Sequence, residues 1–361
     1  MSKHDPRRAR IAIIGAGWWS TQTHLPTLLA NPYAEIVGIA DLNADKLRAA
    51  GSAYNINSLY TDYRAMLDAE KPDGVIVATN HLAHFDASRE ALVRGMAVLV
   101  EKPMVLRAVE ARALQALAEQ HSAHLMVGYP WHFTPQHREL RELIAAGRIG
   151  QLQMVSTLYA SMVVEFLRGN PQSYQSVFNY PVTGPTAATY SDPRIAGGGQ
   201  GVLQVTHAAA LLLWLTGLKP VSVSAFMERH DLRVDLCDAI TVRFDNDAIG
   251  TIASTGNIAR IQTDNQRLDY RLFGTEGYAM LEVIEGTASV YTNDGAIQRL
   301  PLTPPDNRYP AECTSQHLVD LVLGRTTVNQ SPASVGVRTV ELLEASYRSA
   351  TEGRVIRVDE L

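Results

Sequence analysis

Two glycines and a carboxylate near the N-terminus have the spacing of a dinucleotide site. Gly15 and Gly17 follow a short apolar run at residues 11–14, and Asp41 ends a second apolar run at residues 35–41. Gly15 permits a tight turn, and Gly17 lets the backbone approach a pyrophosphate at the N-terminus of the next helix. A carboxylate at Asp41 can accept hydrogen bonds from ribose hydroxyls, and it repels a 2′-phosphate. The spacing therefore predicts an NAD site, with NADP disfavoured.

A lysine further along the chain has the surroundings of a proton-transfer group. Lys102 lies in the triplet Glu101-Lys102-Pro103, which closes an apolar run at residues 97–101. Burial beside a nicotinamide cation disfavours the charged form of a lysine, so such a lysine can take part in proton transfer. Pro103 permits a cis peptide bond at small cost. The alternative is a surface lysine before a proline that begins a helix.

Other residues near the same strand ends complete the predicted cofactor site. Ser20 stands where the glycine-rich phosphate motif has its third glycine, and a serine is small enough for close helix–strand packing. The indoles of Trp18 and Trp19 can pack under the nicotinamide, over a substrate ring or in the core. We also assign to this site Thr79, Asn80, His81, His84, Glu101 and Lys102. Helix capping or packing is an equal alternative for the two histidines.

Length and composition set the broad class. A chain of 361 residues suggests two domains, and its 46% hydrophobic content gives ample core. A net charge of −5 without a basic stripe argues against nucleic acid as a partner. No apolar stretch approaches the ~20 residues of a membrane span. The two cysteines predict no disulfide framework, the histidines lack metal-ligand spacing, and we expect a cytoplasmic protein without a metal site.

The elements that must position these residues fall into two parts. Up to residue 128 strands and helices alternate, which predicts an α/β fold with a doubly wound parallel sheet, a Rossmann domain over residues 1–128. We expect its strands at residues 11–15, 36–40, 74–79, 97–101 and 125–128. Residues 129–361 predict an α+β domain with a large, mostly antiparallel open sheet and a last helix that packs back. Residues 169–200 predict a long irregular loop.

Four motifs, in order, resemble those of the Gfo/Idh/MocA oxidoreductase family. Gly15-x-Gly17 with His24-Leu25-Pro26 resembles its opening motif, and Glu101-Lys102-Pro103 resembles its signature triplet. Residues 75–84 resemble its V-x-V-A-T-P-N-x-x-H segment, with Asn80 for proline and His81 for asparagine. Gly197-Gly198-Gly199 followed by His207 resembles its glycine-rich loop and active-site helix. The resemblance covers nearly the whole chain.

This resemblance implies roles that the residues alone leave open. It implies that Lys102 contacts the reacting hydroxyl and that His207 is the acid/base, although a histidine on an apolar helix is more often a core residue. Many members carry an aspartate four residues before that histidine, where this chain has Leu203. Gln204 shares the helical face of His207 and is expected to hold a substrate hydroxyl or to orient the histidine.

The remaining expected substrate contacts are aromatic or polar. Trp131 and His132 stand where the family often has arginines, and the flat face of Trp131 suits stacking on a sugar or interdomain packing. From the long loop we select Tyr190 and Asp192.

Together these features predict hydride transfer between NAD and a secondary alcohol of a sugar, glycoside or cyclitol, with Lys102 and His207 assisting proton transfer. One alternative is an NAD-retaining enzyme that cleaves glycosides through transient oxidation and elimination. Another is a non-catalytic NAD-binding regulator. We expect the chain to form a homodimer or homotetramer through its C-terminal sheet.

Overall fold

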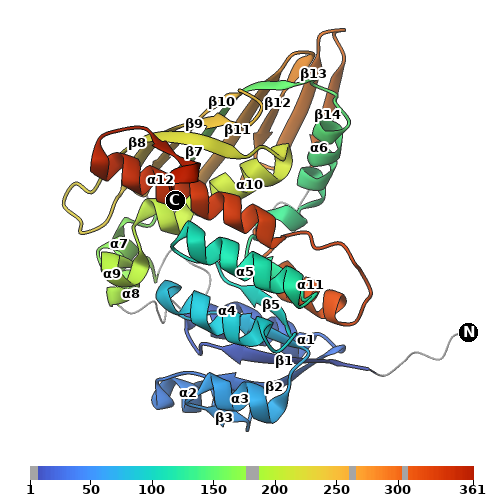
Figure 1. Cartoon of the computed structure of the whole chain (residues 1–361), viewed down its shortest axis with the longest axis vertical. Coiled ribbons are helices and arrows are strands. Elements are labelled where there is room, and N and C mark those ends of the chain that lie inside the picture. Colours follow the sequence, from blue (N-terminus) through green and yellow to red (C-terminus); the bar gives the residue numbers. More distant parts are fainter. Residues whose placement is uncertain (1–6, 176–186, 260–265, 303–307) are drawn as a thin grey trace, which may run out of the picture. The chain divides into compact units, whose positions relative to one another are not determined.

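The computed structural model describes residues 7–175, 187–259, 266–302 and 308–361, and the chain divides into two compact units (Figure 1). The first unit comprises Met1–Val105, Val109–Pro130 and Ala311–Ser334, and the second comprises Leu106–Ala108, Trp131–Pro310 and Val335–Leu361. We predicted one domain boundary, at residue 128, and did not predict that residues 311–334 return to the first unit.

The first unit contains a six-stranded parallel sheet. Its strands are β1 (Ala9–Ile14), β2 (Ala34–Ala40), β3 (Leu59–Tyr60), β4 (Gly74–Val77), β5 (Ala97–Val100) and β6 (Leu125–Val127), in the order β3-β2-β1-β4-β5-β6. Every residue of β4 and β5 is buried, as expected for central strands covered on both faces. The strand order reverses between β1 and β4, and ligands of such sheets bind beyond the carboxyl ends of the strands at that point. The predicted Rossmann fold is confirmed.

Helices connect these strands. They are η1 (Ser20–His24), α1 (Leu25–Ala30), α2 (Ala44–Tyr54), α3 (Tyr63–Glu70), η2 (His81–Ala83), α4 (His84–Leu92), α5 (Ala108–Gln120) and α11 (Glu312–Val322). The side chains of Asn43 and Asp62 cap α2 and α3 by accepting hydrogen bonds from first-turn N–H groups. Helix α11, far away in sequence, packs against α1, β4 and β5.

The second unit contains a nine-stranded, mostly antiparallel sheet, as predicted. Its strands are β7 (Leu152–Ser161), β8 (Pro220–Glu228), β9 (Cys237–Phe244), β10 (Ile249–Thr255), β11 (Gln266–Gly274), β12 (Gly277–Glu282), β13 (Thr287–Thr292), β14 (Ile297–Pro301) and β15 (Ile356–Arg357). Their order is β14-β13-β12-β11-β7-β10-β9-β8-β15, and β7 and β10 pair in parallel. Along β9 buried residues alternate with exposed ones, so one face of the sheet carries the core.

One face of this sheet carries α6 (Pro135–Ala145), α10 (Thr206–Thr216) and α12 (Ala333–Glu352), and in the described part of the chain no helix covers the other face (Figure 1). All residues of α10 from Thr206 to Leu215 are buried, which is typical of a helix enclosed in a core. Short helices complete the chain: η3 (Pro130–Phe133), α7 (Val164–Leu167), η4 (Pro171–Tyr174), α8 (Ala187–Ser191), α9 (Pro193–Ala196), η5 (Gly201–Val205) and η6 (Val358–Glu360).

The predicted irregular loop at residues 169–200 is therefore partly wrong. Its described part contains η4, α8 and α9, and residues 176–186 lie outside the described residues. Pro171 and Pro193 occupy first-turn positions, where a proline favours helix initiation, and Asp192 caps α9 by accepting from the Arg194 N–H.

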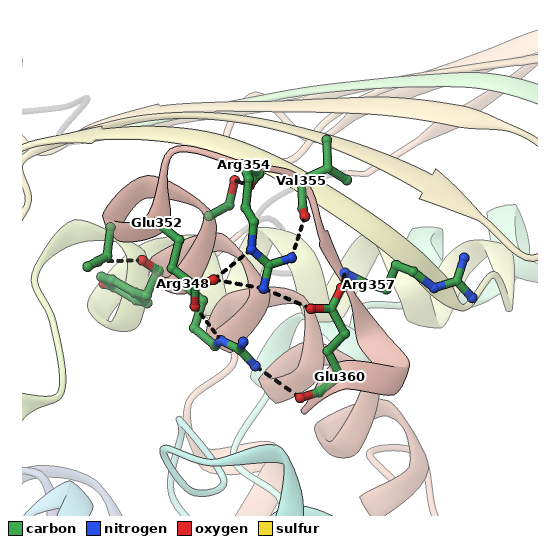
Figure 2. Close-up of polar contacts among 9 residues, drawn as sticks. Arg348, Glu352, Arg354, Val355, Arg357 and Glu360 are labelled. Atoms are coloured by element: carbon green, nitrogen blue, oxygen red, sulfur yellow. Dashed lines mark hydrogen bonds and ion pairs between the residues drawn. The ribbon is translucent and has the colours of Figure 1, made fainter.

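Ion pairs link the C-terminal segment to the end of α12 (Figure 2). Arg354 pairs with Glu352 and with Glu360 at 2.7 and 2.8 Å, and Arg348 pairs with Glu352 at 3.0 Å. Arg348 also donates to the Glu360 carbonyl, and the Arg357 N–H donates to the Glu360 side chain. These contacts bracket β15, which adds to the edge of the sheet beside β8.

A buried carboxylate organises the glycine-rich turn before η5. Asp235 is 5% exposed and accepts hydrogen bonds from the N–H groups of Gly199 and Gly201, both at 2.7 Å. The Tyr347 hydroxyl on α12 donates to the same carboxylate at 2.9 Å. A Cβ atom at Gly198 would collide with the Tyr347 hydroxyl. The glycines are therefore required by close packing of the turn against α12 as well as by its conformation.

A second carboxyl, Asp238, lies beside this turn and gives the fold a measurable pH dependence. Burial and the neighbouring Asp235 raise the pKa of Asp238 well above its usual range, so its carboxyl keeps its proton to a higher pH in the folded chain than in the unfolded chain. Folding thus becomes less favourable as pH rises above the unfolded pKa of ~3.9.

We expect Asp238→Asn to remove this penalty. The stability of the variant relative to the native chain should rise between pH 5 and pH 7, with a slope of up to ~1.4 kcal/mol per pH unit. Urea unfolding at several pH values measures it, with Asp247→Asn, an exposed turn residue of the same unit, as the matched control. Equal pH dependence in the two variants would contradict a raised pKa of Asp238 in the folded chain.

Candidate active site

The turn after β1 has the shape of a phosphate-binding cradle. Gly15 has a φ of +107°, and a Cβ atom there would collide with the Ala78 carbonyl oxygen. A Cβ atom at Gly17 would meet only that oxygen, at 4.0 Å, so Gly17 faces open space. The turn thus leaves room for an anion beside Gly17, and these residues fit a dinucleotide pyrophosphate.

Ser20 forms a side-chain hydrogen bond to the glycine turn. Its hydroxyl is buried and donates to the Gly15 carbonyl at 2.6 Å. The replacement of the third glycine therefore adds a hydrogen bond to the turn. Ser20 also begins η1, a π-helix, and contact of its side chain with a cofactor stays a prediction.

Asp41 lies one residue beyond β2 and faces the same turn. Its two carboxylate oxygens accept hydrogen bonds from the N–H groups of Ala16 and Asn43, each at 2.8 Å. Each oxygen keeps a further lone pair, so the carboxylate can still accept from ribose hydroxyls. The neighbouring Leu42 is 90% exposed.

The residues after β4 tie this strand end to the lysine turn. The His84 ring is fully buried, with Nδ1 at 2.9 Å from the Pro103 carbonyl oxygen and Nε2 at 3.3 Å from that of Thr79. Burial lowers the pKa of His84 although these contacts oppose the shift. His81 packs edge-on against His84, and the Asn80 side chain caps η2. The structure thus gives Asn80 and His84 positioning roles, and cofactor contact of Thr79, Asn80, His81 and His84 stays a prediction.

Lys102 occupies the turn that His84 braces. The Lys102–Pro103 peptide bond is cis, as the sequence allowed. The lysine is partly buried, and burial lowers its pKa to about 8 although the negative charge of Glu101 opposes the shift. An amine with a pKa near working pH is suited to hold or exchange a proton.

The Glu101 carboxylate, next to Lys102 in the chain, is surrounded by hydrogen-bond donors. The Trp19 indole N–H, His24 Nε2 and the Lys102 backbone N–H lie at 3.1, 3.1 and 3.2 Å from its oxygens. Burial raises the pKa of Glu101, but contacts with His24 and Lys102 outweigh it, so the pKa lies below its ordinary value. A Cβ atom at Gly128 would lie 2.7 Å from the carboxylate, so only glycine fits there. Trp19 thus positions Glu101, while its neighbour Trp18 packs edge-on against it. Cofactor contact of Trp18, Trp19 and Glu101 stays a prediction.

In the second unit, His207 lies at the start of α10 and is 7% exposed. The Tyr309 ring packs edge-on against it with centroids 6.2 Å apart, and Tyr309 packs edge-on against Trp131 at 5.1 Å. We did not predict Tyr309, because a single aromatic residue in a proline-rich connection carries no periodic signal.

Trp131 and His132, which we predicted to contact the substrate, are buried and pack against other aromatic rings. Trp131 is 3% exposed and lies between Tyr309 and His137. His132 is fully buried and stacks on Trp214 with centroids 4.8 Å apart. Their contact with a substrate stays a prediction.

The other residues predicted to contact the substrate lie in η5 and in the segment of α8 and α9 before it. Gln204 is the one residue of η5 that is not buried. Leu203, at the position of the family's aspartate, belongs to an apolar cluster with Val234 and Leu236, against which Tyr190 packs. Asp192 pairs with Arg194, whose hydrogen bonds lower the pKa of Asp192 to about 2, and with Arg233. Substrate contact of Gln204, Tyr190 and Asp192 stays a prediction.

The described residues contain no group of three or more histidine, cysteine, aspartate or glutamate residues placed to hold a metal ion. The same residues include no helix with the length and apolar character needed to cross a membrane.

Comparison with known proteins identifies relatives over nearly the whole chain. MocA of Rhizobium meliloti, a rhizopine catabolism protein, is 28% identical over 280 residues, which is 75% of this chain and 78% of MocA. D-apiose dehydrogenase of Paraburkholderia graminis is 35% identical over 144 residues, 40% of this chain and 38% of that protein. The structure of levoglucosan dehydrogenase with NADH and levoglucosan has a TM-score of 0.78 at 18% identity, covering 98% of this chain and all of that one.

Family profiles match both units. Residues 9–129 match the oxidoreductase family with an NAD-binding Rossmann fold, and residues 137–280 match the GFO/IDH/MocA C-terminal domain. The glycine turn, the Glu101-Lys102-Pro103 triplet and the helix of His207 lie within these matches. The chain belongs to the Gfo/Idh/MocA family of oxidoreductases.

Proposed function

We propose that the chain is an NAD-dependent dehydrogenase that oxidises a secondary alcohol of a sugar, glycoside or cyclitol. The observation that carries the proposal is Lys102, partly buried, with a pKa of about 8, on a turn braced by His84 and Glu101. The family membership supports hydride chemistry, and D-apiose dehydrogenase and levoglucosan dehydrogenase support a carbohydrate substrate.

Lys102 and His207 divide the work on the reacting hydroxyl in this proposal. A bound nicotinamide supplies the hydride acceptor. His207 takes the hydroxyl proton, and the Lys102 ammonium donates a charge-assisted hydrogen bond to the oxygen as negative charge develops on it. Gln204 and Trp131 hold the substrate ring. Leu203 stands where many family members have an aspartate. In this proposal the His207 imidazole is therefore the proton acceptor of the second unit.

The charge on Lys102 predicts the pH profile. The ammonium loses its proton as pH rises through about 8, so kcat/KM for oxidation should fall above that pH. In Lys102→Arg the fall should disappear, because a guanidinium stays charged, although the maximum should be lower. In Lys102→Ala turnover should fall about 10²-fold or more with NAD affinity nearly unchanged.

NADH absorbance over a panel of monosaccharides, glycosides and inositols identifies the substrate for these measurements, and NAD binding is followed by fluorescence. Lys46→Ala, an exposed lysine of α2, is the control. Native turnover in Lys102→Ala would remove the lysine from the mechanism. Turnover without added cofactor by a chain that retains NAD would favour transient oxidation and elimination.

The cofactor preference follows from Asp41. A carboxylate held in the turn by the Ala16 and Asn43 N–H groups repels a 2′-phosphate. We expect the native chain to use NAD at least about 10²-fold better than NADP, a difference of ~2.7 kcal/mol. Asp41→Ser with Leu42→Arg should raise kcat/KM for NADP about tenfold or more. Asp45→Ser, an exposed acid in the first turn of α2, should leave the preference unchanged. A native preference for NADP would overturn the assignment.

We also propose that the uncovered face of the nine-stranded sheet joins two copies of the chain. Strand register places a row of apolar side chains across this face: Ile249, Met154, Phe273, Tyr278, Tyr291 and Ile297. Met154, Ile249 and Ile297 are 40, 50 and 51% exposed. A continuous exposed apolar row of this kind is typical of an interface.

Met154→Arg puts a charge within that row, so it should convert the oligomer to monomer or weaken it at least tenfold. Light scattering after size-exclusion chromatography measures the mass. Ala296→Arg, in the exposed turn between β13 and β14, is the control. A monomeric native chain would contradict this assignment.

A further inference from the structure

The donors around Glu101 come from two distant parts of the first unit. Glu101 keeps 12% of its side chain exposed, and Trp19 and His24 contact the same oxygen, Oε1. Both residues belong to the segment that follows the glycine turn, which ends in η1. The carboxylate is thereby linked to the N-terminal side of the unit.

The His24 ring is oriented from its other side by α11. Ser315 Oγ lies 2.7 Å from His24 Nδ1, and both residues are 0% exposed. Because an ionised carboxylate only accepts, Nε2 carries the hydrogen toward Glu101, while the Ser315 hydroxyl, which can donate or accept, contacts Nδ1. The serine thus holds the ring in the orientation in which Nε2 faces Glu101.

These three residues do not form a hydrolytic triad. Ser315 is fully buried, so no substrate carbonyl can reach its hydroxyl. The serine contacts Nδ1 and the acid contacts Nε2, whereas a nucleophilic serine uses Nε2 and its acid uses Nδ1. The chain of contacts ends instead at the residue next to Lys102.

We propose that Ser315, His24 and Trp19 are positioning residues that hold the ionised Glu101 carboxylate against the lysine turn and so keep the Lys102 ammonium charged. This inference deepens the proposed function and rests on it for its catalytic meaning. The titratable groups that face Glu101 are His24 from η1, His84 from α4 and Lys102 itself.

The physical reason is a balance of two opposed effects on one amine. Burial favours the neutral amine, and the Glu101 charge favours the ammonium. With a pKa of about 8, roughly nine tenths of Lys102 is protonated at pH 7. Loss of a donor lets the carboxylate move or take up a proton, and the balance then shifts toward the neutral amine.

The test measures the protonation of Lys102 directly, in the full chain without substrate. Trace acetylation with acetic anhydride at pH 6–10, followed by peptide mass spectrometry, gives the midpoint at which Lys102 becomes reactive. We expect Ser315→Ala and Trp19→Phe each to lower that midpoint by about 0.5–1 pH unit, and Glu101→Gln to lower it further. A change in reagent access alone would alter the plateau and leave the midpoint unchanged.

Ser346→Ala is the matched control, since Ser346 is also 0% exposed and donates one hydrogen bond, to the Leu342 carbonyl in α12. Trp19 is only partly buried, so Trp19→Phe decides the question if Ser315→Ala does not fold. Unshifted midpoints in folded variants would overturn the inference. Native turnover in Lys102→Ala would instead overturn the proposed function, and the midpoints would still test the positioning of the amine.

Discussion

Burying an ionised carboxylate costs several kcal/mol unless hydrogen-bond donors surround it, and the first unit of this chain builds its site around one. The donors to Glu101 come from η1 and from the lysine turn itself, and α11 orients one of them. Satisfying the charge therefore requires that three segments far apart in sequence be in place together. In the second unit the buried Asp235 side chain is likewise surrounded by donors, which the glycine turn and α12 supply.

The sheet topology explains why these carboxylates lie where chemistry is proposed. In the first unit the carboxyl ends of β1, β2, β4 and β5 carry the glycine turn, Asp41, Thr79 and Glu101 in adjacent strands. Parallel strands bring these ends to one edge, so residues nearly ninety positions apart become neighbours. In the second unit the turn held by Asp235 begins the helix that carries His207, and Tyr309 packs against that histidine.

Local patterns predicted much of this arrangement. Apolar runs bounded by glycines located the strands of the first unit, with the short β3 missed, and the turn glycines and Asp41 lie at the predicted strand ends. Residues that meet only in the folded chain left no such local pattern in the sequence. Ser315, Asp235 and Tyr309 are single residues in a helix or connection, and only folding brings them to Glu101, the glycine turn and His207. The return of α11 to the first unit was missed for the same reason, and the short helices after residue 169 were hidden by a composition typical of loops.

Both helices that carry the key histidines contain a π-helical turn: η1 holds His24, and η5 directly precedes His207. Such a turn accommodates one residue more than an α-helix of the same span. Since each residue of an α-helix advances by about 100°, loss of any one residue there would swing the imidazole around the helix axis relative to the glycine turn. The orientation of each imidazole ring thus depends on the number of residues in the helix as much as on their identity. An insertion or deletion in η1 or η5 would therefore displace the ring more than most single substitutions there would.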